Sequence, residues 1–141
     1  MSHYNDIKTK IKNVEALIAA LCRVKSRTGV WNRNQIEVHA TAQHLYGFED
    51  RARKQTAEII IRRQHVGGAA NDIGFKKQTD GTYAAIISDY DRKFYNTTWL
   101  QKVGTYYAVE CSKQTCEAKG LPYKETVDEK NRPVIRITVG A

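Results

Sequence analysis

The sequence predicts an α+β fold, a two-layer sandwich in which two helices cover a mostly antiparallel sheet of about five to seven strands. Two observations lead to this prediction. Several short segments have strand-like patterning, either alternation of period two or β-branched residues, and only two segments show helical periodicity. The strand-like stretches also follow one another through short turns, which favours antiparallel neighbours. We expect the order β-α-β-β-β-β-α-β-β in a single domain over residues 1–141.

The first strand and the first helix follow from the patterning of residues 4–24. Residues 4–11 alternate, so that Ile7 and Ile11 face the interior. Asn13 is a good N-cap for a helix over 14–24, whose apolar residues recur at helical spacing. The same alternation gives the first strand a cationic outer face, formed by Lys8, Lys10 and Lys12.

The middle of the chain predicts four strands. Residues 25–34 are polar and loop-like, and residues 35–40 alternate weakly as a strand. We expect residues 41–55 to form an exposed loop or the tip of a hairpin. Three more strands follow, at 56–64, 72–76 and 82–88. The last two are joined at Asp80-Gly81, because this dipeptide supplies the positive φ angles of a tight turn.

The C-terminal third predicts a long helix and a closing hairpin. Residues 97–119 carry an apolar stripe, with Asn96 or Thr97 as a cap and Gly120 as the stop signal. Strands at 123–127 and 134–139 then form a hairpin. The helices are expected to cover one face of the sheet, which leaves the other face partly open for a partner.

Composition excludes several classes of protein. The 141 residues are 41% hydrophobic and contain no apolar run of the roughly 20 residues that cross a membrane. The chain start lacks a secretory pattern, and three cysteines are an odd number, so we expect free thiols and a cytoplasmic protein. The net charge is +8, and residues 1–65 hold 12 of the 23 basic side chains but 6 of the 15 acidic ones. This surplus attracts polyanions.

No arrangement of residues predicts catalysis. The four histidines have no metal-ligand spacing, and no phosphate-binding glycine loop is present. Asp89 and Asp91 share a side of an extended chain, so they either hold a hard cation or satisfy loop amides, and Asp72 presents the same two alternatives. We therefore predict no catalytic residue, no metal site and no cofactor.

Two kinds of binding surface remain. The leading hypothesis is a binding module that contacts a partner protein, or a second copy of the chain, through aromatic and imidazole groups. The alternative is nucleic-acid binding by a basic sheet face with stacking rings. The partner-contact candidates are His3, Tyr4, Tyr90 and Tyr95, and the nucleic-acid candidates are Lys8, Lys10, Lys12, Arg51, Arg53, Lys54 and Trp31.

Four segments resemble a known family. They are the opening Met1-Ser2-His3 with Ile7-Lys8-Thr9-Lys10-Ile11, then Asn71-Asp72-Ile73-Gly74-Phe75, Tyr106-Tyr107-Ala108-Val109-Glu110, and residues 134–140. Together they resemble the hypothetical chloroplast reading frame 35 family, also called domain of unknown function 1257, in its phage or cyanobacterial form. The resemblance implies a compact domain of the host cytoplasm or plastid stroma. It implies no catalytic residues, because the function of that family is unknown.

Overall fold

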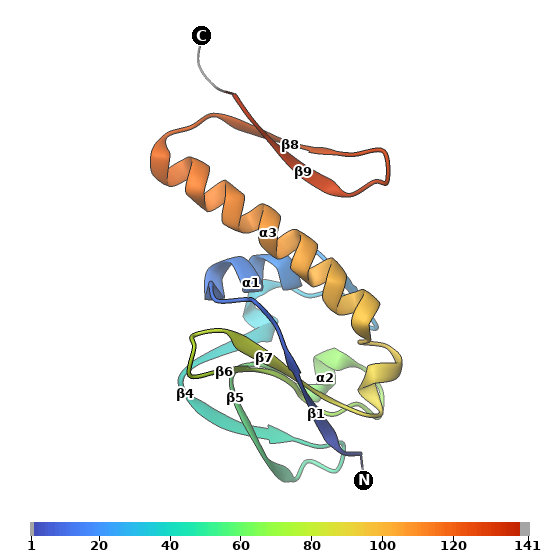
Figure 1. Cartoon of the computed structure of the whole chain (residues 1–141). Helices are drawn as coiled ribbons and strands as arrows, with labels where there is room; N and C mark the ends of the chain where they lie inside the picture. Colours follow the sequence, from blue (N-terminus) through green and yellow to red (C-terminus); the bar gives the residue numbers. More distant parts are fainter. Residues whose placement is uncertain (1, 139–141) are drawn as a thin grey trace.

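The structure is a computed structural model that describes residues 2–138. It confirms the α+β fold, with a five-stranded antiparallel sheet in the order β1-β7-β6-β5-β4. Two helices, α1 (Val14–Leu21) and α3 (Thr97–Lys119), lie over one face of this sheet (Figure 1). The strands of the sheet are β1 (Tyr4–Lys8), β4 (Ile36–Tyr46), β5 (Ala52–Ile61), β6 (Ile73–Lys77) and β7 (Tyr83–Ser88).

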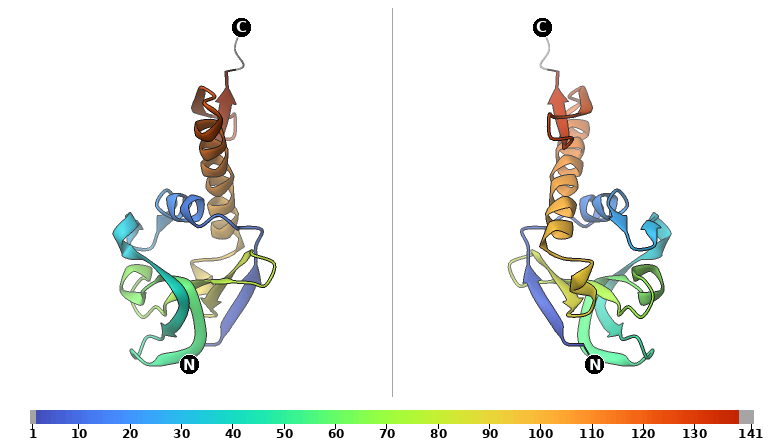
Figure 2. Two further views of the ribbon diagram at one scale, coloured as in Figure 1. Left: turned by 90° about the vertical axis from the view of Figure 1, so that its left-hand side faces the viewer. Right: turned by 90° about the vertical axis from the view of Figure 1, so that its right-hand side faces the viewer.

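Smaller elements connect and extend this core. Two short strands, β2 (Lys25–Ser26) and β3 (Gly29–Val30), form a hairpin after α1, and the short helix α2 (Arg63–Val66) follows β5. The closing hairpin, β8 (Tyr123–Val127) and β9 (Pro133–Ile137), pairs only with itself. It packs along the far half of α3, which projects away from the sheet (Figure 2). Because this hairpin does not join the main sheet, that sheet has five strands. Val139, at the end of the expected last strand, lies outside the described residues.

The main core lies between the sheet and the two helices. Alternate residues of β5 and β6, such as Ile59, Ile61 and Phe75, are fully buried on the inner face. They belong to one cluster with Leu17 of α1 and Val103 of α3. The period of two in the strands and of 3.6 in the helices brings these side chains to the same layer.

The outer face of the sheet is less open than the sequence predicts. The hairpin of β4 and β5 continues to Tyr46 and restarts at Ala52, so only residues 47–51 form its tip. Two register shifts in β4 bend the hairpin. As a result Leu45 and Ala57 curl over Gly74 of the central strand β6. A second buried cluster forms there, made of Leu45, Ala57, Ile60, Ala84 and Ile86.

An ion network attaches the closing hairpin to both helices. Arg23, just after α1, donates to Glu110 of α3 at 2.8 Å and makes a two-pronged contact with Glu125 of β8. Lys113 of α3 lies 2.7 Å from Glu125 and 3.2 Å from Glu110. Hydrogen bonds from Arg23 and then Lys113 lower the pKa of Glu125 to about 2.

The crowding at Gly74 gives a testable prediction. An alanine Cβ at this position would lie 2.6 Å from the Cβ of Ala57 and 3.0 Å from Leu45 Cδ2. We expect Gly74→Ala to lower the free energy of unfolding by about 1–3 kcal/mol in a urea titration. Gly104→Ala is the control, since nothing lies within 4 Å of its Cβ position in α3. It should stabilise the protein by about 0.5–1 kcal/mol; a stable Gly74→Ala variant would contradict the packing described.

The low pKa of Glu125 predicts a pH-dependent contribution to stability. The pKa is lowered from 4.5 to about 2 in the folded state, so the stabilisation is complete above the unfolded pKa and disappears as the pH falls through the folded one. At neutral pH, Glu125→Gln should cost about 1–2 kcal/mol in chemical denaturation, and most of this cost should be lost as the pH falls from 4.5 to about 2. Glu129→Gln, in the turn of the same hairpin, should change little. A cost that does not depend on pH would contradict the ion network.

Candidate functional site

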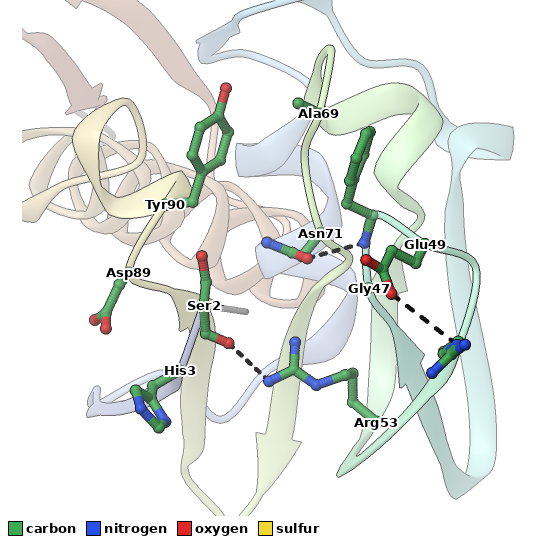
Figure 3. A pocket seen from close by; sticks show the side chains of 11 residues that line it. Ser2, His3, Gly47, Glu49, Arg53, Ala69, Asn71, Asp89 and Tyr90 are labelled. Carbon is green, nitrogen blue, oxygen red and sulfur yellow. Dashed lines mark hydrogen bonds and ion pairs between the residues drawn. The ribbon is translucent and has the colours of Figure 1, made fainter.

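A cleft of about 570 Å³ opens beside the start of the chain (Figure 3). Four parts of the fold line it: residues 2–3, the hairpin from its tip at 47–51 to Arg53 of β5, the loop before β6, and the turn after β7. These segments are far apart in the sequence, so particular side chains must hold them together.

Asn71, in the loop before β6, connects the hairpin tip to the end of β7. Its side-chain oxygen accepts from the backbone N–H of Phe48 at 3.0 Å, and its amide nitrogen donates to Ser88 Oγ at 2.9 Å. Its own backbone N–H donates to the Asp91 carboxylate at 2.9 Å. Asn71 is thus a positioning residue of the cleft, and the sequence indicated it only as the residue before Asp72.

Asp72 has a buried carboxylate that is 1% exposed. Its Oδ2 accepts from the N–H of Tyr46 at 2.7 Å and from Arg62 Nη1 at 2.8 Å, and its Oδ1 accepts from the N–H of Arg63 at 2.7 Å. The Tyr4 hydroxyl donates to its backbone carbonyl at 2.8 Å. Of the two alternatives expected for this residue, the structure therefore shows the one in which backbone amides and a guanidinium satisfy the carboxylate.

Arg53 contributes a cation to the wall of the cleft. Its Nη2 donates to the carbonyl of Ser2 at 2.7 Å, and its guanidinium lies 4.9 Å from the centre of the Tyr4 ring. Within residues 2–138, no carboxylate forms an ion pair with Arg53, and its buried Nη1 has no hydrogen-bond partner. Burial raises the pKa of Tyr4, so this phenol stays neutral beneath the cation.

Two aromatic rings flank the opening of the cleft. Phe48, at the hairpin tip, is 54% exposed, and Tyr90 follows β7. Tyr46 on the same hairpin is also exposed. The guanidinium groups of Arg62 and Arg63 lie over Tyr46 and Phe48 at 5.5 and 6.0 Å respectively. The hairpin therefore presents aromatic surface that continues beyond the cleft.

The structure brings together some residues of both candidate sets. His3 and Tyr90, from the partner-contact set, line the cleft with Arg51 and Arg53 from the nucleic-acid set. Tyr4 lies under Arg53, and Lys54 is the exposed next residue of β5. The remaining basic candidates lie apart from the cleft, because β1 runs away from it and pairs with the opposite end of β7. These exposed residues are Lys8, Lys10 and Lys12.

Two aromatic candidates are core residues, which corrects their expected role. Trp31 and Tyr95 are 2% and 1% exposed, and their rings stack with centroids 5.9 Å apart. The Trp31 Nε1 donates to the carbonyl of His65 at 2.8 Å, and the Tyr95 hydroxyl donates to that of Val66 at 2.6 Å. Trp31 is therefore not available to stack on a base, nor Tyr95 to contact a partner. The sequence did not indicate that Trp31 is buried, because the segment around it is polar but folds inward against α2.

Asp89 and Asp91 do not converge. The chain leaves β7 and enters a 3-10 turn at Asp91–Lys93, so the extended geometry expected for the pair is absent. Asp91 is fully buried, and this burial raises its pKa. Its Oδ2 accepts from Ser88 Oγ at 2.9 Å, whereas the exposed Asp89 accepts from Asn5 at 2.7 Å. Over residues 2–138, the structure contains no group of three or more His, Cys, Asp or Glu side chains placed to hold a metal ion.

Fold and cleft together define a small α+β domain with an aromatic and cationic surface cleft. The chain belongs to the family described as "Protein of unknown function (DUF1257)", whose model matches residues 32–137. The match includes the hairpin and Asn71–Phe75 but begins after the opening motif. Comparisons with curated proteins and with solved structures found no match. None of the helices in the described part of the chain is long and apolar enough to span a membrane.

The buried Asp72 carboxylate gives a prediction about the cleft. In Asp72→Asn, an NH2 group replaces one oxygen and faces a donor, and Arg62 loses its buried charge partner. We expect a loss of about 3 kcal/mol in the free energy of unfolding, measured by urea denaturation. Asp89→Asn, which removes an exposed carboxylate from the same cleft, should cost less than about 0.5 kcal/mol. Equal losses in the two variants would contradict the positioning role of Asp72.

Proposed function

We propose that this protein is a binding module that acts through contact with a partner protein, and that the cleft is its contact site. The observation that carries this proposal is that one cleft is lined both by an exposed aromatic ring, Phe48, and by a cation, Arg53, which has no carboxylate partner in the described part of the chain. Aromatic residues and arginine are enriched at protein interfaces and supply most of their hot spots.

The cleft favours a segment of protein chain as its occupant. Its aromatic surface extends along the hairpin to Tyr46, outside the hollow itself. A contact that covers both the cleft and this hairpin surface is larger than a small ligand makes. The matching segment carries an apolar side chain between Phe48 and Tyr90, with a carboxylate next to it that pairs with Arg53.

The cellular setting is part of the same proposal. Cys22, Cys111 and Cys116 are free thiols. Free thiols are typical of a reducing compartment, so we assign the module to the cytoplasm or to a plastid stroma. A second copy of the chain is a further candidate occupant, and the experiment below separates it from a foreign partner.

The test is selection of a random peptide library displayed on phage against the whole protein. We expect enriched peptides that combine a large apolar residue with Asp or Glu. Phe48→Ala should weaken their binding about fivefold or more, as at an interface hot spot, and Arg53→Lys should also weaken it because the guanidinium fork is lost. Val30→Ala is the control, since Val30 is 60% exposed and lies in β3, outside the cleft.

Two results would contradict the proposal. One is a selection that enriches no sequence. The other is a set of peptides that bind wild type and Phe48→Ala equally. Sedimentation of the free protein tests the second-copy occupant: a dimer that Phe48→Ala dissociates would replace the foreign partner with another copy of the chain.

A further inference from the structure

A second hollow, a groove of about 990 Å³, lies between α3, residues 23–27 and the turn of the closing hairpin. It shares no lining residue with the cleft, and the two hollows adjoin where the ring of Phe94 meets that of the cleft residue Tyr90 edge to face, with centroids 6.1 Å apart. Six basic side chains line this groove, and its lining within residues 2–138 includes no acidic one. The six are Arg23, Lys25, Arg27, Lys102, Lys130 and Arg132.

Most of this positive charge is not neutralised. Arg23 is paired with Glu110 and Glu125, and Arg132 with Asp128. The other four cations have no ion pair within the described range 2–138. A concave surface with several unpaired cations attracts anions more strongly than the same charges do on a convex surface.

The groove also offers aromatic surface. Phe94 is 42% exposed, and the Arg27 guanidinium stacks 3.8 Å from the centre of its ring. Trp99 is only 6% exposed and lies at the base of the groove, where its Nε1 has no hydrogen-bond partner among the described residues. Aromatic rings and arginine planes on which bases stack, next to cations that follow the backbone, are the recurring parts of single-strand binding sites.

The remaining lining distinguishes a nucleic acid from a protein partner. Six of the twelve non-basic lining residues are small hydroxyl or amide side chains. With Arg and Lys, these are the groups that contact phosphates and sugars. The aliphatic lining is limited to Val24, which is buried, and Pro133, so the remaining apolar surface of the groove is aromatic. The neutral polar residues are Ser26, Asn96, Thr98, Gln101, Thr105 and Asn131.

We propose that this groove binds single-stranded nucleic acid. Lys25, Lys102 and Lys130 contact successive phosphates, and Phe94 with Arg27 stacks on a base. The inference does not depend on the proposed role of the cleft, because the two sites have different residues. The groove fits the chemistry that DNA and RNA share, a phosphate backbone with exposed bases. The experiment therefore compares DNA with RNA.

The test is a fluorescence anisotropy titration of the full chain with labelled DNA and RNA oligonucleotides of about 20 nucleotides at several salt concentrations. We compare wild type with the triple variant Lys25→Gln, Lys102→Gln, Lys130→Gln. These three side chains are exposed, so their loss should not unfold the protein. We expect affinity to fall at least about tenfold, and the slope of log K against log salt to decrease by about 2.

A charge-matched control and a stacking variant complete the experiment. The triple variant Lys77→Gln, Lys119→Gln, Lys124→Gln removes the same charge from exposed positions outside the groove and should change affinity less than about threefold. Phe94→Leu keeps apolar packing but removes the stacking ring, and should weaken binding about fivefold or more. The ratio of the affinities for DNA and RNA then shows which of the two nucleic acids the groove prefers.

Several outcomes would overturn the proposal. They are an absence of binding at low salt, equal losses in the groove and control triples, and loss of binding through Lys8, Lys10 and Lys12 instead. Full affinity in Phe94→Leu would contradict the stacking part. Displacement of the oligonucleotide by polyglutamate of equal charge at the same concentration would show that the groove selects acidic polymers in general.

Discussion

The buried carboxylate of Asp72 is the constraint on which the curled sheet depends. A carboxylate removed from water is very unfavourable unless hydrogen bonds and an opposite charge satisfy it. Here it accepts from the backbone of Tyr46 and of Arg63 and from the side chain of Arg62, so the end of β4 and the start of α2 must both reach it. Its neighbour Asn71 extends the same network to the hairpin tip and to β7. The cleft beside β1 is the hollow that this network leaves open.

The segment Asn71–Phe75, which contributes to the family resemblance, therefore has a structural explanation. Asn71 and Asp72 hold the hairpin, Gly74 leaves room for Ala57 and Leu45, and Phe75 fills the main core. None of these roles requires chemistry on a substrate. Membership of the family, shown by the match over residues 32–137, thus identifies the scaffold and not an activity. Function has to be argued from the surfaces that the scaffold carries.

Much of the fold could be predicted from the sequence, because the spacing of apolar residues along a segment indicates whether it forms a helix or a strand. Alternation predicted β1 and the start of β4, and β-branched residues indicated the end of β5. The cap at Asn13 and the stop at Gly120 marked the ends of helices. The features that the sequence did not predict depend on contacts between residues that are distant in the chain. Trp31 lies in a polar segment but stacks on Tyr95 in the core. β4 continues through polar residues, and Leu45 is the residue by which this strand joins the outer cluster. The groove unites Lys25, Lys102 and Lys130, and only the tertiary structure brings such distant residues together.

Recognition, as we propose it, takes place on surfaces assembled from distant segments, and the groove along α3 binds a nucleic-acid strand. The most direct measurement is an NMR titration of the ¹⁵N-labelled protein with a single-stranded oligonucleotide, following backbone amide shifts. We expect saturable shifts confined to residues 23–27, 94–106 and 130–133, with the cleft residues 47–53 unchanged. Shifts centred on the cleft or on residues 8–12, or no shifts at low salt, would contradict the proposal.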